Sequence, residues 1–141
     1  MTYDFTTVTE VRLGTGSHST PKDGMCFMEM VAWFANEEHS DQPACACPIL
    51  GGYGMRLNDA MPGDLREELL KPLIPMIAGT AGSYDDRLKR GQFLALWSVN
   101  KILPIALRAI GLEDHAAACQ SAPDLSAADA AAYAARAAAD A

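Results

Sequence analysis

The sequence predicts an all-α protein, a compact single-domain bundle of about six helices with a short extended N-terminal lead-in. Signals that begin and end helices recur along the chain, and the alternating apolar pattern of strands is almost absent. A length of 141 residues is enough for one domain with its own core. The expected ranges are an extended segment at 1–19, a helical core domain at 20–121 and an alanine-rich C-terminal helix at 122–141.

The first strong helix signal comes directly after the lead-in. Thr20 is a suitable N-cap, Pro21 suits the first helical position, and Asp23 places a carboxylate three residues after the cap. The run Met25–Ala35 is almost wholly apolar. We therefore expect a central core helix there, packed against the helices of residues 48–60 and 86–103.

Proline and glycine mark the next elements. Pro48 begins a helix that runs towards residues 58–59, despite several glycines that lower its helix propensity. A capping signal at Asp64 opens a helix over 65–71, Pro72 restarts or kinks the chain, and a short helix over 73–78 ends at Gly79.

The C-terminal half carries the longest helical pattern. Ser83 and Asp86 cap a helix that reaches about residue 103, where Pro104 ends or kinks it before a continuation to Gly111. A modest helix is expected over 113–120. Ser126 is expected to cap the final helix, in which most residues are alanine.

Composition limits the classes of function. A net charge of −7, from 11 Lys and Arg against 18 Asp and Glu, argues against a general nucleic-acid binder. The N-terminus lacks the pattern of a signal peptide, and Lys101 and Arg108 interrupt the longest apolar stretch, so neither export nor a membrane span is expected. We expect a cytoplasmic protein with reduced thiols.

Catalytic signatures are not apparent in the sequence. The glycine-rich stretches lack the further residues of dinucleotide-binding and phosphate-binding loops, and no catalytic motif is recognisable. An enzyme would need Glu29 to converge with His39 or His18 in one pocket. Lys22 and Asn36 lie seven residues on either side of Glu29, so the polar stripe favours a solvent-facing edge for Glu29 over a functional role.

The most specific candidate site in the sequence consists of thiol and imidazole groups. Cys45 and Cys47 lie close together in sequence, and His115 and Cys119 are four residues apart on one helix face. Together they offer the sulfur and nitrogen ligands that zinc prefers, although two cysteines separated by one residue are an unusual spacing for zinc. The alternative is that Cys26 and Cys119 are small core residues, Cys45 packs in a loop and Cys47 precedes a helix.

Charge is unevenly distributed. The segment 23–55 contains acids but no Lys or Arg, whereas 87–112 contains five bases and no acids. On a straight helix Arg90, Lys101 and Arg108 project in nearly one direction, with Trp97 on the same side. Such a stripe could bind phosphate or an acidic partner. Surface pairs of this kind are common and weak, which favours a stripe that complements the chain's own acidic segment or is solvated. The candidate partner-binding residues are Glu37, Glu38, Asp41, Arg90, Trp97 and Lys101.

One part of the sequence resembles a known group. The run Gly24–Glu29, the run Ser40–Cys45 with Pro48, and the pair Asn58-Asp59 are similar to small conserved hypothetical proteins of actinobacteria and their phages. The motifs 13–16, 73–75 and 79–80 resemble the same group, and the similarity covers roughly residues 13–112. The resemblance implies a bacterial or phage origin and assigns no activity or site.

These observations favour a small non-enzymatic cytosolic protein of regulatory or phage accessory type that acts by protein–protein interaction. The alternative is a metal- or thiol-dependent helical protein that uses Cys45, Cys47, His115 and Cys119, with zinc as the one cofactor to consider.

Overall fold

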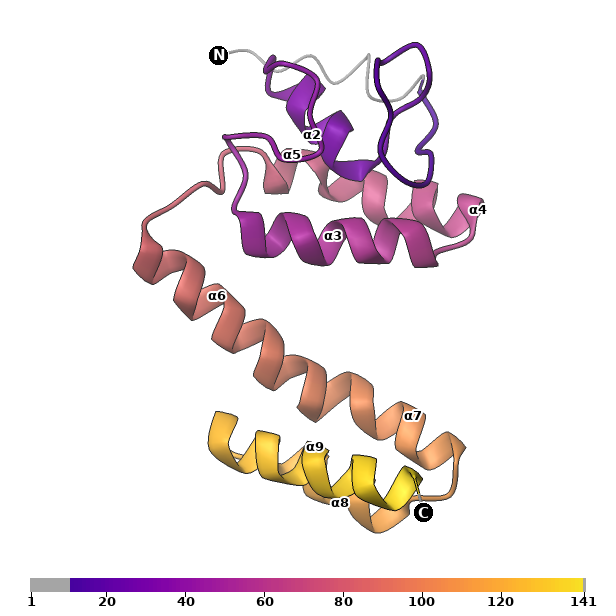
Figure 1. Cartoon of the computed structure of the whole chain (residues 1–141), viewed down its shortest axis with the longest axis vertical. Helices are drawn as coiled ribbons and strands as arrows, with labels where there is room; N and C mark the ends of the chain where they lie inside the picture. Colours follow the sequence, from indigo (N-terminus) through magenta and orange to yellow (C-terminus); the bar gives the residue numbers. More distant parts are fainter. Residues whose placement is uncertain (1–10, 141) are drawn as a thin grey trace. The chain divides into compact units, whose positions relative to one another are not determined.

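The computed structural model describes residues 11–140, and this part of the chain is all-helical, as the sequence predicts. One isolated bridge pairs Leu13 with Met25, and no strand forms among these residues. The contacts divide the chain into two compact units, the first ending at Arg87 and the second beginning at Leu88 (Figure 1). This boundary lies inside the expected core domain of residues 20–121. The predicted lead-in over residues 1–10 lies outside the described residues.

The first unit is built around α2 (Phe27–Phe34), which packs against α3 (Pro48–Ala60) and α5 (Ile74–Ile77) (Figure 1). Its other helical segments are α4 (Gly63–Leu65), the π-helical η1 (Arg66–Leu70) and the 3-10 segment η2 (Lys71–Leu73). All residues of α2 except Trp33 are buried, and they form the core together with Met25, Leu70 and Ile74. Gly54 of α3 makes room for the Phe27 ring, because a Cβ atom on Gly54 would lie 2.7 Å from a ring carbon.

The predicted N-cap at Thr20 and first helical position at Pro21 are wrong, because the core helix begins only at Phe27. Thr20 and Asp23 do bond, with the Thr20 hydroxyl donating to the Asp23 carboxylate at 2.8 Å, but they close a turn instead of opening a helix. Gly24 comes next with φ +127°, a conformation that no helix contains. The N-cap is therefore Cys26, and α2 begins at Phe27.

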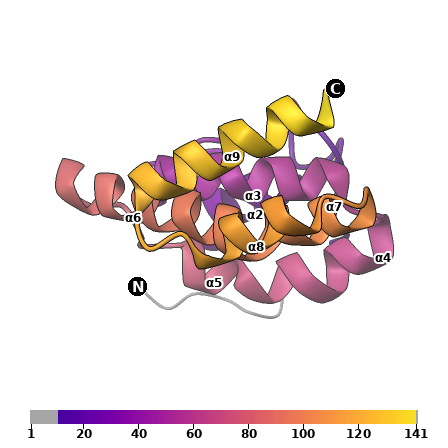
Figure 2. The same cartoon turned by 90° about the horizontal axis from the view of Figure 1, so that it is seen from below.

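The second unit contains α7 (Leu103–Ala109), α8 (Glu113–Ser121) and α9 (Leu125–Ala139), and α8 packs against both others (Figure 2). Its buried core is small and consists of Leu107, Ala116, Cys119 and Ala135. Helix α6 (Tyr84–Trp97) begins at the predicted Ser83–Asp86 cap and crosses the boundary between the units. The N-cap of α9 is Asp124 and not the predicted Ser126, since the Asp124 carboxylate accepts a bond from the Ala127 N–H.

Pro104 lies inside the helical stretch, and a π-helical segment, η3 (Ser98–Ile102), precedes it. Proline has no N–H to donate, and its ring collides with the preceding turn of a regular helix. The wider π turn relieves that conflict without ending the stretch. Gly111 ends α7 with φ +81°, as predicted for a residue just past the end of a helix. Among the described residues, no helix has the length and apolar character needed to cross a membrane.

Candidate functional site

Glu29, His18 and His39, the groups that an enzyme would need to bring together, lie close to one another in the first unit. The Glu29 side chain, 1% exposed, accepts hydrogen bonds from the backbone N–H of His18 at 2.5 Å and of Cys26 at 2.7 Å. The His18 ring donates from Nδ1 to the same carboxylate at 2.8 Å. His39 Nε2 lies 3.7 Å from Glu29 and donates to the His18 carbonyl at 2.9 Å. Glu29 and His18 are therefore directly hydrogen-bonded, and His39 lies close to both.

The solvent-facing position expected for Glu29 is wrong. Lys22 precedes the helix, so the stripe from Lys22 to Asn36 does not run along one helix face. Glu29 instead occupies the third position of α2 and completes a capping box with Cys26. The spacing of a capping box was present in the sequence, but the rule expects serine or threonine where this chain has cysteine.

The surroundings of Glu29 keep its carboxyl group ionised. Burial by itself raises the pKa of Glu29, but the N–H groups of His18 and Cys26 and the His18 ring outweigh burial. The pKa therefore lies below the ordinary 4.5. An ionised carboxylate forms strong hydrogen bonds, and the three that Glu29 accepts hold the loop that carries His18 in place.

The His18 ring packs closely against two glycines. A Cβ atom on Gly14 or on Gly24 would lie within 3 Å of His18 ring atoms, so the ring fills the space between the two glycines. None of His18, Glu29 and His39 lines either the cavity beside Pro48 or the cavity beside Gly16 in this unit. The hydrogen bonds of the cluster hold the loop that carries His18 against α2.

A second set of polar side chains, on α3, η1 and η2, forms hydrogen bonds with the backbone of residues 11–14. The Asn58 side chain accepts from the Phe27 N–H and donates to the Gly14 carbonyl. The buried Arg66 guanidinium donates to three backbone carbonyls, including that of Leu13 at 2.9 Å. Two further side chains belong to this set. Glu67 accepts from the N–H of residue 13, and Lys71 donates to the carbonyl of residue 11. Sequence patterns marked Asn58 only as part of a helix end and did not point to Arg66.

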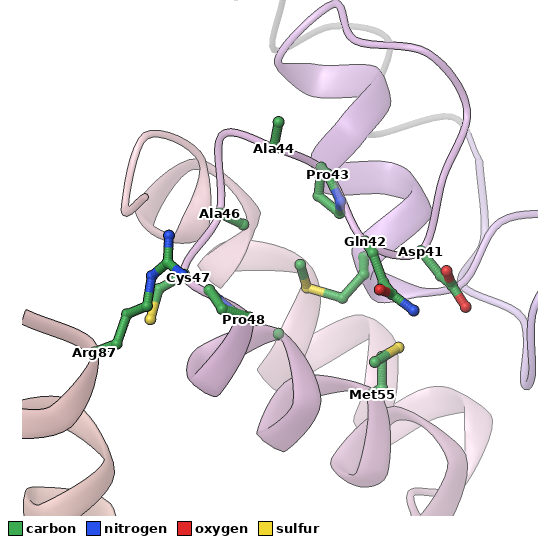
Figure 3. A pocket seen from close by; sticks show the side chains of 11 residues that line it. Asp41, Gln42, Pro43, Ala44, Ala46, Cys47, Pro48, Met55 and Arg87 are labelled. Carbon is green, nitrogen blue, oxygen red and sulfur yellow. The ribbon is translucent and has the colours of Figure 1, made fainter. Parts of the chain in front are cut away.

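Two adjoining cavities open in the same unit. The first, of about 410 Å³, lies between α2, α3 and the loop of residues 41–48 (Figure 3). The second, of about 230 Å³, is bordered by the lead-in at Gly16 and by the end of α3. Asp41 and Met55 line both cavities.

The predicted acidic partner-binding residues do not behave alike. Glu37 is half-buried, and its carboxylate accepts from the Ala44 N–H at 2.7 Å, so it shapes its own loop. Glu38 is exposed. Asp41 is half-buried and lines the cavities. Only part of this acidic set is thus directed at solvent.

The proposed zinc ligands are divided between the two units. Cys45 and Cys47 border α3 in the first unit, whereas His115 and Cys119 lie on α8 in the second. Within residues 11–140, no group of three or more His, Cys, Asp or Glu side chains is arranged to hold a metal ion. Burial raises the pKa of the Cys45 and Cys119 thiols, and that of Cys26 to about 11. The four-residue zinc shell stays a prediction.

The predicted basic stripe is interrupted. Each π turn adds a residue to the helical turn and rotates the rest of the helix, so η3 takes Arg108 out of line with Arg90. Arg108 instead bonds Glu113 at 2.9 Å and Gln120 at 2.7 Å. Trp97 and Lys101 remain exposed, and Arg90 is half-buried.

Comparison with known proteins gives no match: no family model, no curated protein and no solved structure shows significant similarity to the chain. The resemblance to actinobacterial and phage proteins stays a prediction.

Proposed function

We propose that the protein acts by binding another protein through a surface on α6 and η3, defined by Lys89, Phe93, Trp97 and Lys101 and called here the α6 surface. One observation carries the proposal: no residue of α6 is buried, although the helix contains several large apolar side chains. Exposed apolar side chains gathered on one helix face gain free energy when another surface covers them, and such patches mark sites of protein contact. A partner protein would supply that cover.

The apolar part of the α6 surface is pronounced. The Phe93 side chain is 66% exposed and Trp97 is 40% exposed. They are four residues apart and therefore lie on the same side of the helix. Beside them, an open hollow of about 520 Å³ is lined by Phe93, Leu96, Pro123 and Leu125. An exposed aromatic residue beside an apolar hollow is a typical anchor point of a protein interface.

The charge beside this apolar patch indicates the chemistry of the partner. Lys89 and Lys101 are exposed, and the sequence from 87 to 112 contains no acidic residue. Asp124 borders the hollow, but its carboxylate caps α9. The partner that complements this surface is an amphipathic segment with an apolar face and flanking acidic residues.

Site-specific photo-crosslinking in the native host tests the proposal. A photoreactive phenylalanine analogue replaces Phe93, and the control carries it at Tyr133, which is 77% exposed on α9. We expect a discrete adduct with one different protein from position 93 and none from position 133. Mass spectrometry should locate the crosslink in an acidic, amphipathic segment of that protein.

Charge reversal provides the second arm of this experiment. Lys89→Glu with Lys101→Glu should reduce the yield of the adduct, because like charges would then face each other, whereas Lys22→Glu should leave it unchanged. A crosslink from position 93 to residues of the same chain or to a second copy would contradict the proposal. An adduct insensitive to the paired charge reversal would contradict the acidic partner.

A further inference from the structure

The two cavities of the first unit lie next to each other. They are neighbours, because the side chains of Asp41 and Met55 line both, and the acidic end of the smaller cavity therefore adjoins the larger one. The volume of the larger cavity, about 410 Å³, lies within the range of sites that bind small molecules. This site belongs to the first unit and is independent of the α6 surface.

The larger cavity has predominantly apolar walls. They are formed by two methionines, two prolines and small residues, namely Met28, Met55, Pro43, Pro48, Ala46 and Gly51. Methionine side chains are flexible and polarisable and adapt to aliphatic groups of different shape. The walls therefore suit an apolar chain.

One end of the site is acidic. Asp41 lines both cavities, and Asp59 joins it in the smaller one. The Gly16 N–H and the Asn58 amide lower the pKa of Asp59, so its carboxylate is charged at neutral pH. The Asp41 carboxylate has no hydrogen bond or ion pair within residues 11–140. The lining of the smaller cavity includes no Lys or Arg.

The only basic residue that lines the larger cavity is placed away from the acidic end. Figure 3 shows Arg87 beside Cys47 and Pro48, with Asp41 on the opposite side of the cavity. A positive group on a ligand is therefore favoured at the Asp41 end. An organic cation suits this end better than a metal ion, because no set of three ligating side chains meets within the described residues.

We propose that the adjoining cavities bind a small primary amine with a short apolar chain. The ammonium group, which has three donors, bonds at the end formed by Asp41 and Asp59. The chain lies along Met28 and Met55 in the larger cavity. The ligand is a free small-molecule amine, because the volume of the larger cavity is that of a small-molecule site.

Hexylamine is a suitable probe, with hexanol and hexanoate as neutral and anionic controls of the same chain length. The protein has seven methionines, and methyl labelling lets each be followed by NMR in the full-length chain. We expect saturable shifts of the Met28 and Met55 methyl signals with hexylamine, and only weak shifts with hexanol or hexanoate.

Asp41→Asn should weaken hexylamine binding by about tenfold or more, because a neutral amide replaces the negative charge that pairs with the ammonium group. Glu38→Gln changes an exposed carboxylate nearby in the sequence that lines neither cavity, and it should leave binding unchanged. If Asp41→Asn alters the spectrum of the free protein, the comparison of hexylamine with hexanol in the unsubstituted protein decides the question. Equal shifts with all three probes, or none with hexylamine, would overturn the proposal.

Discussion

The two units of this chain obtain their structure in different ways. The first buries large apolar side chains such as Phe27, Met30 and Ile74, and it also buries Glu29, Asn58 and Arg66, each with hydrogen-bond partners. The second buries one leucine, a cysteine and alanines in its core, and its helices are rich in alanine. Packing of apolar side chains and hydrogen bonds of buried polar side chains stabilise the first unit, whereas the helix propensity of alanine supports the second.

This difference explains where each proposed site lies. A tightly packed unit with fixed loops can keep cavities of defined shape, and both cavities that share Asp41 occur in the first unit. A thin core leaves helix surfaces uncovered, and the large apolar side chains of α6 are exposed. The proposed small-molecule site accordingly lies in the first unit and the proposed protein-binding surface on α6.

The largest expected effect comes from the core of the first unit. Phe27→Ala should lower its free energy of unfolding by about 3–5 kcal/mol, because it leaves a cavity under Gly54. The matched control, Phe93→Ala, alters a side chain that is 66% exposed and should change stability by less than about 0.5 kcal/mol.

Urea unfolding measures the stability of both variants. Trp33 fluorescence reports on the first unit and Trp97 on the second, in chains whose other tryptophan is replaced by phenylalanine. Equal losses for the two substitutions would remove the contrast between the units.

A smaller effect is expected at the start of α9. Asp124→Ala removes the side chain that accepts from the Ala127 N–H at 2.9 Å and should cost about 1 kcal/mol. The loss should appear in the unfolding curve followed by Trp97 and not in that followed by Trp33. Asp129→Ala is the control, since it removes an exposed carboxylate that lies beyond the first turn of the same helix. A capping role for Asp124 would be ruled out if both substitutions had the same effect.

The last prediction concerns the stability of the first unit in acid and involves no change at neutral pH. Glu29, Asp59 and Glu67 have pKa values below the ordinary ones, and all three fasten residues of the first unit. A lowered pKa in the folded state contributes stability that is complete above the unfolded value, 4.5 for glutamate, and is lost as the pH falls through the folded value. The first unit should therefore lose stability below about pH 4.5.

Acid titration followed separately by Trp33 and Trp97 measures this effect. We expect a loss of stability in the Trp33 signal that Glu29→Gln reduces and Glu38→Gln does not. If the stability of the first unit stayed constant through this range, the carboxylates would not fasten the lead-in as the distances indicate.

The sequence by itself determined the all-α class and most helix ends. Pro48, the Ser83–Asp86 cap, Gly79 and Gly111 act through local backbone geometry, which depends on neighbouring residues alone. It also placed the core helix, because a run of apolar residues must be buried.

Tertiary structure alone decided the role of Glu29. The bonds to its carboxylate include those from His18, eleven positions away, and polar spacing cannot reveal partners that the chain brings back from outside the helix. The same holds for Arg66, whose guanidinium reaches the carbonyl of Leu13. The cavities around Asp41 likewise exist only when α2, α3 and the 41–48 loop come together, since a cavity is a property of packed surfaces and not of any one segment.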